Sequence, residues 1–301
     1  MSDLQSTPVF RTEGLSLGYG PRTAVSDVDL VINPGETTVL IGANGSGKST
    51  LFKGLSRQLP PRSGRIQFRS QDLGQLRPKP YARQVALLPQ SPVVPEGLTV
   101  AELVARGRHP HRRWWGAPSP GDDEAIARAL SMVDLEQLAE RPVDELSGGQ
   151  RQRVWIALVL AQDTPTVLLD EPTAALDLAH QVELLDLMRS LRRPDGSRTT
   201  VVAVLHELNL AARVADRVIA LKEGGVQAVG TPDEVFTEQT LWEVFDLEAE
   251  IVRDPTEGHP VVLPRGRRRA AAEPEGARTE PGESTEPGES TVEVPVGMEA
   301  S

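Results

Sequence analysis

Residues 42–50 read GANGSGKST and limit the possible folds of this chain more than any other segment. An apolar run, Thr37 to Ile41, comes directly before them, and a stretch with helical periodicity starts at Lys48. A strand, a glycine-rich turn and a helix start in that order form a phosphate-binding loop, or P-loop, because backbone N–H groups and the helix N-terminus converge on an anion. The segment therefore predicts an α/β fold built around a P-loop.

Each residue type in this loop suits one part of a magnesium nucleotide. Glycines let the backbone approach the phosphates, Lys48 reaches the β and γ phosphates, and the Ser49 hydroxyl ligates Mg²⁺. The alternative is a glycine-rich turn with a chance lysine, and the flanking strand and helix make that the weaker interpretation. The predicted ATP contacts are Gly42, Asn44, Gly45, Ser46, Gly47, Lys48, Ser49 and Thr50.

A second apolar run ends in two adjacent carboxylates. Residues 166–169 precede Asp170 and Glu171, and open parallel sheets place their active sites at the carboxyl ends of strands. On this interpretation Asp170 belongs to the Mg²⁺ shell, and Glu171 orients and deprotonates the attacking water. Without the P-loop, a solvated acidic turn after a core strand would be an equally good interpretation.

The hydrophobic pattern predicts an α/β core with a helical insertion. Residues 8–35 alternate apolar and polar positions between turn signals, which predicts a small antiparallel β subdomain. Residues 95–162 are helical in pattern, and Thr99 and Glu102 have the spacing of a capping box. We therefore predict one domain, residues 8–263, with its core at 8–94 and 163–263 and a helical subdomain at 95–162. Further strands are expected near 65–68, 84–88, 166–170, 199–205 and 217–221, and helices at 178–193 and 208–215.

Charge and composition exclude several classes of function. There are 43 acidic residues against 32 Lys and Arg, so the basic surplus of a nucleic-acid-binding protein is missing. Cysteine is absent, which excludes disulfides and thiolate metal sites. The longest apolar run, Val154 to Ala161, is too short to cross a bilayer. Any role at a membrane is therefore expected to depend on a partner.

The composition changes at residue 264. From there to residue 301 the chain is rich in Pro, Gly, Glu, Arg and Ser, and TEPGES occurs at 279–284 and again at 285–290. Such a segment has too little apolar surface to form a packed core. We predict that residues 264–301 are a disordered tail.

Residues 146–150 read LSGGQ, which resembles the signature of ABC ATPases. Two glycines beside a serine at a helix start form a second anion site, here within the helical subdomain. The resemblance covers residues 9 to about 263 and implies the P-loop fold of that family. It also implies a head-to-tail homodimer in which the signature of one copy contacts the γ-phosphate held by the other. The residues implied in that contact are Ser147, Gly148, Gly149 and Gln150.

The other motifs of the family occur in its usual order. By resemblance, Tyr19 stacks on adenine, Gln90 contacts Mg²⁺ or the water, and His206 orients the water against the γ-phosphate. Asp177 resembles the aspartate that reaches the nucleotide of the second copy. Taken alone, a strand-end glutamine or histidine is more often solvent-facing or structural. Ala174 departs from the serine common in the family, which leaves one inter-subunit hydrogen bond open.

Three longer stretches, residues 105–130, 202–224 and 240–264, resemble the ATPases of iron–siderophore, haem and vitamin B12 importers. The resemblance implies import of an iron–siderophore or related chelate, without identifying the chelate. It implies transmembrane permease subunits, an extracellular or periplasmic substrate-binding protein, and a position at the cytoplasmic face of the membrane. The groove that receives the permease is expected to include Arg106, Arg108 and Arg113, with a solvated basic face as the alternative.

Two other classes of function remain open from the residues alone. A soluble ABC ATPase acting on non-membrane partners would share the nucleotide motifs, but no long coiled-coil heptads separate Lys48 from Leu146. A P-loop kinase for a small molecule would share the phosphate loop, but it offers no reason for the LSGGQ segment. We therefore favour the importer ATPase.

Overall fold

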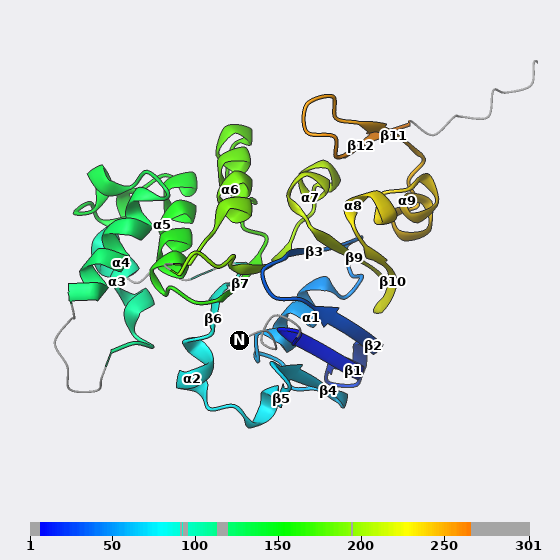
Figure 1. The fold of residues 1–301 in the computed structure, drawn as a ribbon, viewed down its shortest axis with the longest axis horizontal. Coiled ribbons are helices and arrows are strands. Elements are labelled where there is room, and N and C mark those ends of the chain that lie inside the picture. Colours follow the sequence, from blue (N-terminus) through cyan, green and yellow to red (C-terminus); the bar gives the residue numbers. More distant parts are fainter. Residues whose placement is uncertain (1–6, 91, 93–95, 113–119, 194, 266–301) are drawn as a thin grey trace, which may run out of the picture. The chain divides into compact units, whose positions relative to one another are not determined.

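The fold is organised around a six-stranded sheet (Figure 1). The computed structural model describes residues 7–90, 92, 96–112, 120–193 and 195–265. In the sheet the strand order is β10-β9-β3-β8-β7-β6, and every neighbouring pair is parallel except β9 and β10. The strands are β3 (Thr37–Gly42), β6 (Val85–Leu88), β7 (Thr166–Asp170), β8 (Thr200–Val204), β9 (Arg217–Lys222) and β10 (Gly225–Gly230).

The central strands are buried on both faces, as parallel strands covered by helices must be. Successive residues of a strand point to opposite faces, so β3 sends Val39 and Ile41 into one hydrophobic cluster and Leu40 into another. The first cluster packs against helices α6 (Leu178–Ser190) and α7 (Leu208–Val214), and the second packs against α1 (Lys48–Leu55). This sandwich holds the carboxyl ends of the strands in place.

A four-stranded antiparallel sheet lies beyond α1, in the order β2-β1-β4-β5. The N-terminal pattern therefore predicted the small β subdomain correctly. Leu51 and Phe52 of α1 share a hydrophobic cluster with Leu15 and Leu17 of this sheet, so α1 is covered on both sides. The strands are β1 (Phe10–Tyr19), β2 (Arg22–Ile32), β4 (Ser63–Phe68) and β5 (Gln71–Asp72).

The helical segment is inserted between two strands that pair in the sheet. β6 precedes it and β7 follows it, and the two are parallel neighbours. Capping boxes start two of its helices, with Thr99 paired to Glu102 as predicted from their spacing and Ser147 paired to Gln150. The helices are α3 (Val100–Ala105), α4 (Pro120–Ser131) and α5 (Gly148–Ala161), with the short α2 (Pro78–Ala82) before them.

An ion pair inside the helical segment corrects one expectation. Arg108, which we expected to line a groove for the permease, is only 9% exposed. Its Nε donates to Asp122 at 2.8 Å, and its Nη1 donates to the carbonyl of Ala161 at 2.8 Å. A buried guanidinium needs such partners, so Arg108 serves the packing of α4 and α5. Arg106 is exposed, and Arg113 lies outside the described residues.

The chain after β10 forms elements that the sequence pattern did not predict. They are α8 (Pro232–Val235), α9 (Glu238–Phe245) and a hairpin of β11 (Ala249–Arg253) with β12 (Pro260–Pro264). The side-chain amide of Asn209 in α7 donates to the carbonyl of Val262 at 3.2 Å and accepts from its N–H at 2.7 Å. The hairpin is thereby fastened to α7.

Two predicted boundaries were wrong by a few residues. α6 ends at Ser190 rather than near residue 193, because Leu191 has an extended ψ of 120°. Pro264 belongs to β12, and the Arg265 N–H donates to the carbonyl of Glu248 at 2.8 Å, so the folded chain extends past the predicted start of the tail. The remainder of the predicted tail, 266–301, lies outside the described residues. Across the part of the chain that is described, no helix combines the length and apolarity needed to span a membrane.

Candidate nucleotide-binding site

The glycine-rich loop connects β3 to α1 in the context that the sequence predicted. Lys48 is the first residue of α1, and its Nζ donates to the carbonyls of Gly42 at 2.7 Å and Ala43 at 3.1 Å. Burial lowers the pKa of Lys48, and the nearby carboxylates of Glu171 and Asp170 oppose that shift. The ammonium group is therefore held over the loop, next to the carboxylates, where it can meet a phosphate.

The loop opens into a pocket of about 540 Å³. Tyr19 borders it at the end of β1 with 48% of its surface exposed, and the Lys53 Nζ lies 5.7 Å from its ring centroid. An exposed aromatic ring at the mouth of a phosphate pocket can stack on a base. The pocket is lined by Tyr19, Arg22, Thr23, Ala24, Asn44, Gly45, Ser46, Gly47, Lys48, Ser49, Thr50, Glu171, His206 and Glu223.

Glu171 and His206 meet because their strands are parallel neighbours. β7 pairs with β8, so the residues that follow both strands leave the sheet at one edge. His206 Nε2 lies 2.6 Å from Glu171 Oε1, and the Gln90 side chain also hydrogen-bonds to Glu171. Burial alone would raise the pKa of Glu171, but these hydrogen bonds hold it below its usual value. Glu171 is therefore a carboxylate at neutral pH, in the state that can accept a proton.

Asp170 has the properties of a cation ligand. It is 4% exposed, and its Oδ1 has no hydrogen-bond partner within the described structure. Burial, followed by the charge of Glu171, raises the pKa of Asp170 to about 6. A buried carboxylate oxygen without a partner is costly, and a hard cation such as Mg²⁺ would satisfy it. The residues present therefore fit a magnesium ion at this strand end.

The signature segment lies outside the lining of this pocket. Ser147 is the N-cap of α5, exposed to solvent, and its Oγ accepts from the Gln150 N–H at 3.2 Å. A Cβ built on Gly149 would lie 3.7 Å from the carbonyl of Ala175, so the start of α5 is close to the loop that follows β7. Asp177 ends that loop as the exposed N-cap of α6. Ser147 and Asp177 are thus exposed within one chain, while Lys48, Glu171 and His206 share one pocket.

Several residues of the pocket were not predicted from the sequence. Arg22 lies directly opposite Tyr19 in the β1–β2 hairpin, so a prediction of that register could have found it. Thr23 and Ala24 follow on the same strand. Glu223 comes from the turn between β9 and β10 and carries no motif.

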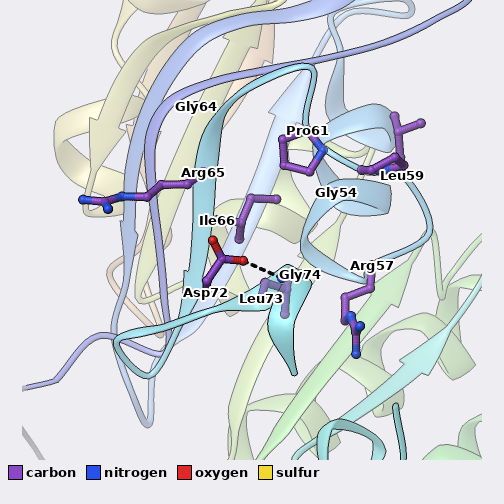
Figure 2. A pocket seen from close by; sticks show the side chains of 11 residues that line it. Gly54, Arg57, Leu59, Pro61, Gly64, Arg65, Ile66, Asp72, Leu73 and Gly74 are labelled. Carbon is purple, nitrogen blue, oxygen red and sulfur yellow. Dashed lines mark hydrogen bonds between the residues drawn. The ribbon is translucent and has the colours of Figure 1, made fainter. Parts of the chain in front are cut away.

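A second pocket, of about 410 Å³, lies at the far end of α1 (Figure 2). Arg57 and Asp72 lie on different sides of it, and Ile66 and Leu73 are among its apolar lining residues. The Asp72 Oδ1 accepts from the Gly74 N–H at 2.8 Å, so this carboxylate stabilises the turn at residues 72–74. None of the predicted catalytic or nucleotide-binding residues lines this pocket.

Comparison with known proteins gives a consistent result. The family model described as ABC transporter matches residues 25–174. The probable siderophore transport system ATP-binding protein YusV of Bacillus subtilis (strain 168) is 46% identical over 90% of this chain and 98% of its own length. The petrobactin import ATP-binding protein FpuD of Bacillus anthracis is 45% identical over 86% of this chain and 94% of its own. The hemin import ATP-binding protein HmuV of Rhodococcus jostii (strain RHA1) is 42% identical over 86% of this chain and 87% of its own.

Solved structures agree with these relatives. An inward-facing putative metal-chelate type ABC transporter matches with a TM-score of 0.72 and 27% identity, covering 86% of this chain and 98% of that chain. A dimeric bacterial ABC transporter cassette matches with a TM-score of 0.66 and 30% identity, covering 74% of this chain and 98% of that one. The predicted fold class is therefore confirmed.

Proposed function

The chain belongs to the ABC transporter family as an ATP-binding subunit with ATPase activity, and from that premise we propose that it powers the import of an iron–siderophore or related chelate. The observation that carries the proposal is the likeness, along almost the whole chain, to ATP-binding proteins named for siderophore transport and petrobactin import. The ATPase itself does not have to touch the cargo. The chelate class is therefore argued from relatives and not from a pocket in this chain.

The pocket supports a separate role for each of four residues in ATP hydrolysis. The ATP phosphates lie along the P-loop with Lys48 between the β and γ phosphates, and Tyr19 stacks on adenine. Glu171 takes the proton of the water whose oxygen bonds to the γ-phosphorus. The bond from that phosphorus to the β–γ bridging oxygen breaks, and ADP leaves with the electron pair. His206 orients Glu171 through the 2.6 Å contact of its Nε2 with Glu171 Oε1.

Three residues would hold the magnesium ion: Ser49, Gln90 and Asp170. When bound, the ion neutralises phosphate charge. Asp170 brings the buried oxygen without a partner, and Gln90 brings an amide at the junction with the helical segment. Because Gln90 also hydrogen-bonds to Glu171, movement of the chain beyond Gln90 would change the position of the Glu171 carboxylate.

The exposed signature supports a head-to-tail pair. Ser147, Gly148, Gly149 and Gln150 of one copy, with Asp177, would close over the nucleotide held by the P-loop of the other. One structurally similar bacterial cassette forms a dimer, and another is part of an ABC transporter complex. We assign this chain to the cytoplasmic face of the membrane through its permease, with a substrate-binding protein delivering the chelate from outside.

Deletion of the gene tests the cargo. Growth should fail under iron limitation and recover with excess inorganic iron, and uptake of labelled iron–siderophore should fall. The matched control is complementation with the Lys48→Ala chain, which should not restore uptake although the protein is made. Unchanged siderophore uptake together with lost haem or cobalamin uptake would transfer the assignment to that cargo. Unchanged uptake of all three would favour a soluble ABC ATPase with non-membrane partners.

A further inference from the structure

The turn between β9 and β10 is hydrogen-bonded to the P-loop. The Gly224 N–H donates to the carbonyl of Ser46 at 3.0 Å, and the Gly224 carbonyl accepts from the Ser26 N–H at 3.0 Å. Ser46 is the loop residue before Gly47, and Ser26 belongs to β2 of the antiparallel sheet. Gly224 therefore joins the phosphate-binding loop to another part of the fold by backbone contacts alone.

The geometry of the peptide bond gives this contact a consequence for the nucleotide. The Ser46 carbonyl and the Gly47 N–H belong to one planar trans peptide, so they point in opposite directions. Because the Gly224 N–H holds that carbonyl, the Gly47 N–H is directed away from the turn. Gly47 lines the pocket, and P-loop N–H groups are the donors that bind phosphate.

Space around the contact excludes any side chain. Gly224 has a φ of 83°, and a Cβ built on it would lie 2.8 Å from the carbonyl oxygen of Ala24. Gly47 has a φ of 103°, and its Cβ would lie 2.7 Å from the same oxygen and 3.4 Å from the Gly224 Cα. The turn, the P-loop and β2 thus meet at one point where neither Gly47 nor Gly224 has room for a side chain.

We propose that Gly224 is a positioning residue for nucleotide binding, which aims the Gly47 N–H at the ATP phosphates by holding the Ser46 carbonyl. The inference rests on nucleotide binding and does not depend on the proposed cargo. It assigns a binding role to a turn that lies outside the segments predicted from the sequence to bind nucleotide.

Replacing Gly224 by alanine tests the proposal, with Gly225→Ala as the matched control. Gly225 is the next residue, its φ is not positive, and its Cβ would meet nothing closer than 3.7 Å. Gly224→Ala should weaken the binding of a fluorescent ADP by about tenfold, the effect of losing one charge-assisted hydrogen bond. Gly225→Ala should stay within about twofold of the original affinity. A lower unfolding temperature with unchanged ADP affinity in Gly224→Ala would reduce Gly224 to a structural role and overturn the proposal.

Amide hydrogen exchange on the unaltered chain keeps the proposal testable if Gly224→Ala does not fold. Addition of ADP should protect peptides covering residues 222–226 together with those covering 42–50. The reason is that the Gly224 N–H is hydrogen-bonded to Ser46, so it exchanges more slowly when the P-loop is held by nucleotide. Protection confined to the P-loop peptides would contradict the coupling.

Discussion

Glu171 has a φ of 50°, a conformation that residues other than glycine rarely adopt. Its N–H donates to the carbonyl of Val204 at 3.2 Å, so the end of β8 holds it in that conformation. Backbone strain of this kind persists where the surroundings determine it, and it clusters at active sites. Here it lies at the residue whose carboxylate meets His206 and Gln90.

The Glu171→Gln variant tests that residue's chemistry. Glutamine keeps the shape and loses the base, so turnover should fall by about 10²-fold or more while ATP binding is retained. Steady-state ATPase assays and ATP titration measure the two quantities separately. Turnover at the original rate would remove Glu171 from the role of general base.

The Lys48→Ala variant tests the phosphate loop. Lys48 supplies the only lysine ammonium among the residues lining the described pocket, and hydrogen bonds from it to a bound phosphate would be charge-assisted. Losing two such bonds should weaken ATP binding by about 10²-fold or more and abolish ATPase activity. Lys79→Ala is the control, because the Lys79 Nζ donates to the Arg112 carbonyl and does not line the pocket. Near-normal ATP turnover in a folded Lys48→Ala chain would rule out the assignment of residues 42–50 as the phosphate-binding loop.

At the level of helices and strands, the N-cap of α5 has a second possible role besides starting the helix. The Ser147 Oγ accepts from the Gln150 N–H, and the Gln150 Oε1 accepts from the Ser147 N–H at 3.1 Å. This reciprocal pair holds the serine at the helix start, and its own O–H remains able to donate to an anion. The LSGGQ segment is therefore both a capping box and a candidate phosphate contact.

The buried ion pair of the helical segment predicts a large loss of stability on substitution. Arg108→Met would remove the closer of the two arginines paired with the buried Asp122, leaving Arg112 at 3.9 Å, and should lower the free energy of unfolding by about 3 kcal/mol. Arg141→Met is the control, because Arg141 and Glu145 form an exposed pair at 3.5 Å that contributes less than about 1 kcal/mol. Urea denaturation of both variants measures the difference. Equal losses would mean that the Arg108 contact does not stabilise the fold.

For the chain as a whole, the β11–β12 hairpin is the last element of the described structure, which ends at Arg265. Truncation after Arg265 should leave the unfolding temperature and the basal ATPase rate unchanged, because the removed segment has the composition of a chain without a core. Truncation after Glu248 is the contrasting variant. It removes Val262, which is 2% exposed and paired with Asn209, and should lower the unfolding temperature. A clear fall after the first truncation would show that the tail contributes to stability.

Assembly gives the remaining prediction. ATP stabilises a closed dimer for as long as it is not hydrolysed, so Glu171→Gln with MgATP should elute as a dimer in size-exclusion chromatography. Adding Ser147→Asp should abolish that dimer, because aspartate keeps the helix cap and repels the γ-phosphate of the second copy. Elution that is indifferent to both ATP and Ser147 would contradict the head-to-tail arrangement.

Much of the core was predictable because its signals are local. Strand β7 has the predicted bounds, 166–170, and α3 begins at the predicted capping box. The C-terminal hairpin was missed because it is held in place by contacts with α7, which is distant in the sequence. The prediction that Arg108 lines a permease groove was wrong. Its buried partner, Asp122, lies in α4, and the basic run around Arg108 does not indicate that contact.

The phosphate loop, the acidic strand end and the signature are each made of neighbouring residues, so their chemistry can be recognised along the chain. The parts contributed by a distant segment are different: Glu223 lines the pocket and Gly224 bonds to Ser46 only after β9 has paired beside β3. Strand pairing of this kind depends on long-range packing, which leaves no periodic pattern in either segment. That is why the motifs were visible in the sequence and the support that orients them became visible only in the folded chain.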